Sequence, residues 1–318
     1  MKKASTETCV CAGVDVGKAR LDYAIAGGPG PLYCANTPEG RAEMISFFKR
    51  HGVRRVGLEA SGSYEIEVVD DLREAGFEVL VMQPLQVRAY GQFKLKRAKS
   101  DPIDAVLIAQ CTAACDEVRE APDARLAPFA EHLTFIDQLT EDIARLCTRR
   151  ERFRDPRLKQ QLNDDIKQKN ALKRRELQLL AKAVRLHKDL ARKLELLISI
   201  QGIALPTALV LVIRMPELGK ITREQAAALI GAAPFVHDSG RYKGQRRTGG
   251  GRARARTSLF AAAQAARQWN PALKTLYERL IKQKKAHNVA IIACVRKLVT
   301  YANTVLARDK PWAIKNIS

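Results

Sequence analysis

Four acidic residues stand where a folded chain could bring their carboxylates together. Asp15 and Glu59 each end an apolar run typical of a buried strand, and Asp101 and Asp104 lie three residues apart where a helical pattern starts. Residues three apart share one face of a helix, and acids at strand ends and a helix start can converge on one edge of a sheet. Such oxygen ligands suit Mg²⁺, and two ions could assist both the attacking and the leaving oxygen of a phosphodiester.

The same acids have a structural explanation. Ser100 or Asp101, followed by Pro102, is suited to cap the helix. Asp104 then adds favourable negative charge in the first helical turn. An Asp after an apolar strand is also common in turns, so the residues alone leave a metal site and helix capping both open.

A second candidate for chemistry is Ser239, which lies in a glycine-rich and basic segment. Residues 241–256 carry seven basic side chains and no acid. Arginines around a phosphate stabilise the charge that builds on it, which would let a serine act as nucleophile. Ser-Gly is also a common turn, and arginines often only neutralise phosphate charge. The phosphate contacts predicted by charge are Arg241, Lys243, Arg246, Arg247, Arg252 and Arg254.

The charge balance indicates a polyanionic partner. The net charge is +21 over 318 residues, which favours nucleic acid or an anionic membrane surface. Residues 1–110 contain 15 basic (Lys, Arg) and 14 acidic (Asp, Glu) side chains, residues 111–213 contain 19 and 15, and residues 214–318 contain 21 and 5. The acids are concentrated where a metal would bind and the bases where phosphates would. No run of eighteen apolar residues occurs, so neither a membrane span nor a signal peptide is expected.

Seven scattered cysteines, an odd number, predict free thiols in a reducing cytoplasm. Cys9 and Cys11 form a C-x-C, and Cys111 and Cys115 lie one helical turn apart. Because no second pair has zinc-ligand spacing, buried thiols are favoured over a zinc site.

Alternating strands and helices are predicted for residues 1–127. Residues 10–26 indicate two strands around a glycine turn, 38–51 a helix, and 54–64 a buried strand that runs into a loop. A helix ending at Gly76, a strand at 78–84 and a helix beginning near residue 99 follow. This alternation is typical of an α/β sheet.

From residue 128 to 196 apolar residues recur at steps of three and four, which predicts long helices. The pair Asp155-Pro156 should break them. The segment is then a helical hairpin arm, or a coiled coil that pairs two subunits. His187 lies on the second apolar seam and is interpreted as a tolerated seam residue.

Residues 197–318 predict a compact, mainly helical domain. Within it, QGIALPTA at 201–208 resembles a helix-hairpin-helix, whose glycine turn offers backbone amides to phosphates. Ala204 stands where such hairpins usually carry a second glycine, which puts one close backbone approach in doubt. A plain turn that packs two helices explains the segment equally well.

Taken together, several motifs resemble one protein family, in the right order from about residue 10 to 312. The motifs are GVDVGK, VGLEASGSY, KSDPIDA, QGIALPTA, ALIGAAPFVHDSG and NPALKTLYERL. The family is that of the insertion-sequence transposases with an Asp-Glu-Asp-Asp motif, insertion-sequence family one-hundred-and-ten, which includes the Piv-type DNA invertases.

This resemblance implies a RuvC-like domain of ribonuclease H fold at 1–127, a coiled-coil linker at 128–196 and a C-terminal transposase domain at 197–318. It implies Mg²⁺ binding by Asp15, Glu59, Asp101 and Asp104, and covalent attack on DNA by Ser239. It also implies donor and target DNA and a noncoding guide RNA (the bridge RNA) as partners. A homo-oligomer, dimer or tetramer, is implied in which the serine of one subunit completes the carboxylate site of another.

Three hypotheses follow. The first is a cytoplasmic, nucleoid-associated transposase or recombinase that acts through a phosphoserine. The second is a RuvC-like nuclease that cuts DNA with a metal ion and water. A site-specific DNA invertase is an alternative to the transposase, since it would use the same site. The third is a nucleic-acid-binding protein without catalysis, whose acids only cap helices.

Overall fold

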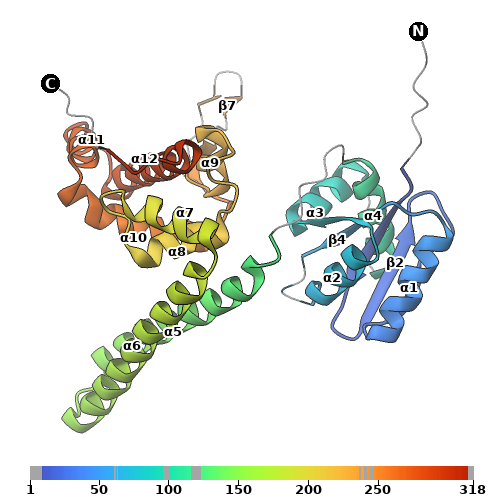
Figure 1. Ribbon diagram of the computed structural model, residues 1–318, viewed down its shortest axis with the longest axis horizontal. Helices are drawn as coiled ribbons and strands as arrows, with labels where there is room; N and C mark the ends of the chain where they lie inside the picture. Colours follow the sequence, from blue (N-terminus) through green and yellow to red (C-terminus); the bar gives the residue numbers. More distant parts are fainter. Residues whose placement is uncertain are drawn as a thin grey trace. The chain divides into compact units, whose positions relative to one another are not determined.

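A computed structural model describes residues 9–60, 62, 64–95, 101–115, 123–235, 238–239, 242–243 and 247–313. At residues 101, 102, 235, 238, 239, 242, 243 and 247 it describes the backbone only. The chain forms two compact units, one ending at residue 121 and the other beginning at 122 (Figure 1). The finer division at 127 and 196 stays a prediction.

The first unit contains a five-stranded mixed sheet with the order β3-β2-β1-β4-β5. β1, β2 and β3 are antiparallel neighbours, whereas β4 and β5 run parallel to β1. The strands are β1 (Cys11–Val16), β2 (Arg20–Ile25), β3 (Leu32–Ala35), β4 (Arg55–Glu59) and β5 (Glu78–Met82). The predicted α/β sheet is confirmed. β3 is missing from the prediction because only Cys34 of its four residues is buried, so it has no alternating pattern.

Helices cover both faces of this sheet (Figure 1). One face packs Val14, Leu58 and their neighbours against α1 (Pro38–Arg50) and α2 (Ile66–Glu74). The other face carries α3 (Pro84–Phe93) and α4 (Asp101–Ala113), with a smaller core. α3 is missing from the prediction because it leaves the side chains of Leu85 and Phe93 exposed, which blurs its apolar face.

α4 lies in backbone contact with β1 at Gly13. A Cβ atom on Gly13 would lie 2.2 Å from the Ala109 nitrogen and 2.6 Å from the Ala105 oxygen. Gly13→Ala is therefore expected to lower the free energy of unfolding of the first unit by about 3 kcal/mol or more, since backbone atoms cannot rotate away as a side chain does. Far-UV circular dichroism in urea measures this loss.

Two features of the chain sharpen that measurement. Both tryptophans, Trp269 and Trp312, lie in the second unit, so their fluorescence should report an unchanged transition. Gly30→Ala is the matched control, because a Cβ there meets nothing within 4 Å. If Gly13→Ala unfolds at the same urea concentration as Gly30→Ala, the contact between α4 and β1 is not as close as described.

The second unit begins with a long helical hairpin. α5 (Leu126–Arg152) and α6 (Pro156–Arg185) run antiparallel (Figure 1). Side-chain pairs link them at both ends. His132 contacts Glu176 at 3.0 Å near the base, and Arg150 donates to Asn163 at 3.0 Å near the tip. The predicted break at Asp155-Pro156 is confirmed, with the Asp155 carboxylate accepting from the Arg157 amide at 2.8 Å.

The second apolar seam is not one helix, which corrects the prediction for His187. α6 ends at Arg185, and His187 caps the start of α7 (Lys188–Ile198). The chain leaves Leu186 exposed there and turns so that Leu190 and Leu194 enter the core of the second unit. No glycine or proline marks this turn, because tertiary burial rather than local sequence dictates it.

The rest of the second unit is a compact group of helices, as predicted. They are α8 (Leu205–Arg214), α9 (Arg223–Leu229), α10 (Ala253–Trp269), α11 (Pro271–Lys282) and α12 (His287–Arg308). Between α9 and α10 lie four short strands: β6 (Pro234–Phe235), β7 (Asp238–Ser239), β8 (Tyr242–Lys243) and β9 (Arg247–Thr248). α12 is long and apolar enough to cross a membrane, but half of that stretch is buried in this core, as in the central helix of a globular domain.

Candidate functional site

The crossing of α4 over the sheet is set by two glycines. Gly13 of β1 faces Ala105 and Ala109, and a Cβ on Gly57 of β4 would lie 1.8 Å from the Thr112 hydroxyl. Gly13 and Gly57 are register partners in the parallel pair. α4 therefore crosses from β1 towards β4, and the two glycine positions mark the face of the sheet that it covers.

Asp15 and Glu59 lie on this same face. Each is two residues beyond one of the crossing glycines, and alternate strand residues point to the same side. They also follow directly after Val14 and Leu58, which are register partners, so they occupy matching positions on neighbouring strands. Both side chains are partly buried. That these carboxylates converge on one metal-binding edge of the sheet stays a prediction.

The helix supplies the other predicted acids. Asp104 directly precedes Ala105, whose oxygen lies at Gly13, so the start of α4 is close to β1. Its side chain is partly buried. The backbone of Asp101 lies one turn earlier, on the stripe that continues through Ala105 to Ile108 and Thr112, but its side chain is outside the described residues.

A further acid, Asp22 of β2, is missing from the sequence prediction. It pairs directly with Asp15 in the antiparallel register, so both project to the face that α4 covers. Asp22 is only 4% exposed, and the Arg20 guanidinium donates to its two oxygens at 2.9 and 2.6 Å. The sequence does contain a signal for Asp22. Once Val16 and Leu21 are paired across the tight turn, the next antiparallel pair is Asp15 with Asp22.

These carboxylates fit a divalent ion by chemistry and by the elements that carry them. Hard cations such as Mg²⁺ take oxygen ligands and retain water for phosphate chemistry. Within the described residues, no three His, Cys, Asp or Glu side chains are gathered closely enough to hold a metal. A metal site at this edge thus stays a prediction, in which Asp101 is the acid whose side chain the structure does not describe.

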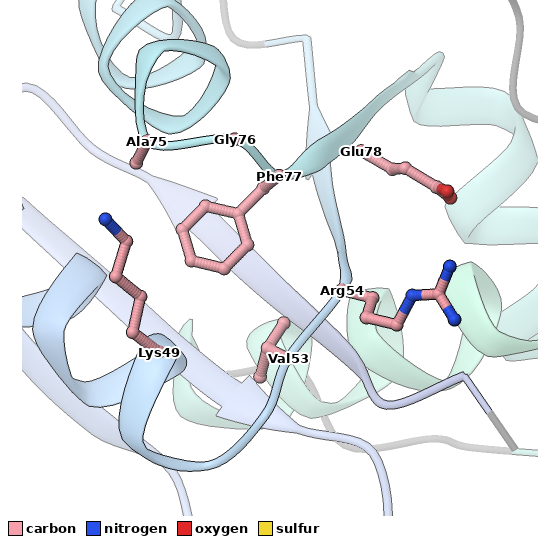
Figure 2. A pocket seen from close by; sticks show the side chains of 7 residues that line it. All are labelled: Lys49, Val53, Arg54, Ala75, Gly76, Phe77 and Glu78. Atoms are coloured by element: carbon pink, nitrogen blue, oxygen red, sulfur yellow. The ribbon is translucent and has the colours of Figure 1, made fainter. Parts of the chain in front are cut away.

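A surface hollow of the first unit lies elsewhere. It measures about 340 Å³ and is lined by Lys49, Val53, Arg54, Ala75, Gly76, Phe77 and Glu78 (Figure 2). Its lining residues lie before the start of β4 and at the start of β5, whereas Glu59 is the last residue of β4. The hollow is therefore at the opposite end of the parallel strands from the acids, and it is not part of the carboxylate face.

Ser239 lies on a β-hairpin. β6 pairs with β9, and further along β7 pairs with β8, so that Ser239 is opposite Tyr242 with two residues between them. The side chain of Ser239 is outside the described residues. The sequence predicts this stretch only as a loop, because two-residue strands are too short to show alternation.

The base of the hairpin is closed by two glycines and one arginine. Gly231 (φ 69°) and Gly251 (φ 61°) are in backbone contact, since a Cβ on Gly251 would lie 2.4 Å from the Gly231 nitrogen. The Arg256 guanidinium donates to the Ile230 oxygen at 3.0 Å and to the Gly250 oxygen at 2.6 Å. Arg256 therefore ties together the two chain segments from which the hairpin projects.

Two predicted phosphate contacts form ion pairs within the chain. Arg252 donates to both oxygens of Glu217, and Arg254 donates to Asp137 at 2.8 Å. Asp137 also accepts from Arg214 at 2.6 Å, which joins α5, α8 and α10. A role for Arg252 and Arg254 in nucleic-acid binding stays a prediction. The side chains of the remaining predicted contacts lie outside the described residues: Arg241, Lys243, Arg246 and Arg247.

The segment that resembles a helix-hairpin-helix forms the turn between α7 and α8. Gly202 (φ 107°) is required there, because a Cβ would lie 2.2 Å from the Ala266 Cβ of α10. Ala204 has an extended backbone (φ −90°, ψ 170°), so a second glycine is not needed for conformation. Packing against α10 accounts for the glycine, and phosphate binding by this turn stays a prediction.

The cysteines fit the interpretation of free core thiols. All seven are free, and Cys11, Cys34, Cys111 and Cys294 are buried. Burial raises the pKa of the Cys11, Cys34 and Cys111 thiols to about 11, so these groups stay protonated at neutral pH and are poor nucleophiles.

Two family models match the chain. Residues 12–153 match a model described as "Transposase", whose name carries the DEDD motif, and residues 194–278 match "Transposase IS116/IS110/IS902 family". The two matches cover 142 and 85 residues, together more than two thirds of the 318. The first includes the carboxylate face and the second includes the Ser239 hairpin. A search of curated proteins found no match.

Proposed function

This chain belongs to the IS116/IS110/IS902 family of transposases and is an enzyme that acts on DNA, and from this premise we propose that it cuts and rejoins DNA through a phosphoserine link at Ser239. The crossing of α4 over β1 and β4 carries the proposal, because it brings acids of two strands and one helix to one face. Mg²⁺ is proposed to bind at four carboxylates: Asp15, Glu59, Asp101 and Asp104.

In the proposed reaction the Ser239 hydroxyl attacks a DNA phosphorus. The Oγ–P bond forms, the bond from phosphorus to one sugar oxygen breaks, and that oxygen leaves as a hydroxyl carrying the proton that serine loses. A hydroxyl of another strand then attacks the phosphoserine and releases Ser239. Each step exchanges one phosphodiester for another, so no nucleotide cofactor is consumed.

The carboxylate face and the basic hairpin would have separate tasks. Mg²⁺, when bound, stabilises charge on the attacking and leaving oxygens of a phosphodiester. Of the seven basic residues of 241–256, Arg252 and Arg254 pair with internal acids and Arg256 binds backbone oxygens. The other four supply cations to the segment that carries Ser239. The partly buried setting of Asp15 and Glu59 strengthens their attraction for a cation relative to open water.

The family also supports proposals for fold and partners. The strand order, with three antiparallel strands followed by two parallel ones, supports a RuvC-like ribonuclease H fold for the first unit. Family members work on donor and target DNA, and by the same resemblance we propose a noncoding guide RNA. The oligomer is proposed to be a dimer or tetramer in which the Ser239 of one subunit acts at the carboxylates of another.

Peptide mapping of trapped protein tests the proposal. The protein is expressed with the DNA that flanks its gene, recovered under denaturing conditions, and digested with nuclease and trypsin. Ser239 is the only hydroxyl-bearing residue of the tryptic peptide 224–241, so nucleotide mass on that peptide identifies the linkage. We expect a nucleotide adduct there and on no other serine peptide.

Two other results would redirect the proposal. DNA that is cut but carries no protein indicates a metal-dependent nuclease that uses water. An adduct on a different peptide keeps the covalent route but removes Ser239 from it.

A further inference from the structure

Arg20 lies beside the carboxylate face and is held there by two side chains. Its guanidinium makes the two-pronged contact with buried Asp22, the strand partner of Asp15. It also lies over the ring of Tyr33 on β3, with 4.0 Å between the guanidinium carbon and the ring centroid. Tyr33 is the register partner of Asp22, so the acid, the cation and the ring share one face of two neighbouring strands, β2 and β3.

This arrangement differs from simple neutralisation of a buried acid. The Arg20 side chain remains 49% exposed, while Asp22 is almost wholly buried and Tyr33 is 66% exposed. A carboxylate and an aromatic face together fix the plane of the guanidinium, which lowers the entropy lost when it binds a ligand. A fixed, half-exposed cation next to several acids is suited to receive an anion that the acids alone would repel.

We propose that Arg20, oriented by Asp22 and Tyr33, binds a phosphate of the nucleic-acid strand that enters the carboxylate site. A guanidinium matches phosphate through paired N–H donors, and its contact would hold the strand one β-strand away from Asp15. Asp22 and Tyr33 are then positioning residues, which act through Arg20. The inference rests on the proposed function, because it requires a strand at the carboxylates.

A double substitution separates phosphate binding from charge balance. Arg20→Ala alone leaves Asp22 buried without its cation and should destabilise the fold. Adding Asp22→Asn removes that charge and restores stability, but not the contact with phosphate. Both variants are measured as full chain with guide RNA and DNA, for urea unfolding, for the rate of covalent DNA attachment, and for DNA affinity at several salt concentrations.

The control is an arginine that is similarly exposed and paired. Arg125 is 44% exposed and makes a two-pronged pair with Asp123, also two positions away, and a second pair with Asp189. Arg125→Ala removes the same charge from the second unit. We expect it to retain the attachment rate and most of the salt dependence of binding.

We expect the double variant to be as stable as the wild type, yet to attach DNA about 10- to 100-fold more slowly. Its plot of log affinity against log salt should be shallower by about 0.9 for one lost duplex phosphate contact. If rate and slope recover together with stability, Arg20 only balances Asp22 and the inference is overturned. If the wild type forms no DNA adduct at all, the proposed function fails, and the salt slope alone still decides whether Arg20 binds phosphate.

Discussion

Ser239→Ala is expected to abolish strand exchange, with the rate constant for DNA cleavage falling at least about 10⁴-fold. The variant lacks the oxygen that attacks phosphorus, and water bound in its place is neither fixed by the hairpin nor able to preserve the phosphodiester for rejoining. Single-turnover cleavage of labelled donor DNA, with guide RNA and Mg²⁺ supplied, measures the rate. Affinity for DNA should change little, because phosphate contacts rather than one hydroxyl carry the binding energy.

Ser258→Ala is the matched control for this loss. Ser258 lies on α10 rather than on the hairpin, and its hydroxyl donates to Thr207 at 3.1 Å. It should cleave and rejoin DNA at the rate of the wild type. Normal recombination by Ser239→Ala would falsify the covalent mechanism, and cleavage without rejoining would favour hydrolysis by water.

Glu59→Gln is expected to lower the cleavage rate by about 10³-fold or more, which corresponds to several kcal/mol of lost transition-state stabilisation. Glutamine keeps the shape of the side chain but not its negative charge, so the proposed Mg²⁺ site loses one anionic ligand. The same variant should weaken the stabilisation of the first unit by added Mg²⁺ or Mn²⁺, because an ion that binds only the folded state raises the melting temperature.

Glu74→Gln provides the control, since Glu74 is an exposed acid of α2 on the opposite face of the sheet. It should leave both the cleavage rate and the metal-dependent melting shift unchanged. The result against the proposal would be equal cleavage by Glu59→Gln and the wild type, which would assign Glu59 a structural role.

Most of the sheet and its helices follow from local sequence patterns. β1, β4 and β5 are apolar runs of the right length, and α1 carries Pro38 and the capping Thr37 at its start. The acids Asp15 and Glu59 could be placed because each ends such a run. Which face they share could not be read locally, since it depends on α4 approaching the backbone at Gly13 and Gly57.

Other parts of the site depend on contacts between residues distant in the chain. In the sequence alone, Asp22 is indistinguishable from an ordinary polar strand residue. Its position beside Asp15 follows only from the strand register. Arg252 and Arg254 look like further phosphate ligands in the sequence, but the fold brings Glu217 and Asp137 to them. Charge counting locates a basic segment, but it does not distinguish cations that face a ligand from cations that hold the chain.

The closed base of the hairpin has a consequence for how such enzymes diversify. Nineteen residues lie between Gly231 and Gly251, whose backbones touch, so the chain leaves the helical core for the hairpin and returns to it side by side. Once the ends of a loop are fixed, doubling its length costs only about 0.6 kcal/mol of closure entropy. Insertions and deletions beyond Ala233 are thus expected to cost the core little. The hairpin can be exchanged between relatives as a cassette, which would let the reach of the nucleophile evolve independently of the scaffold that carries it.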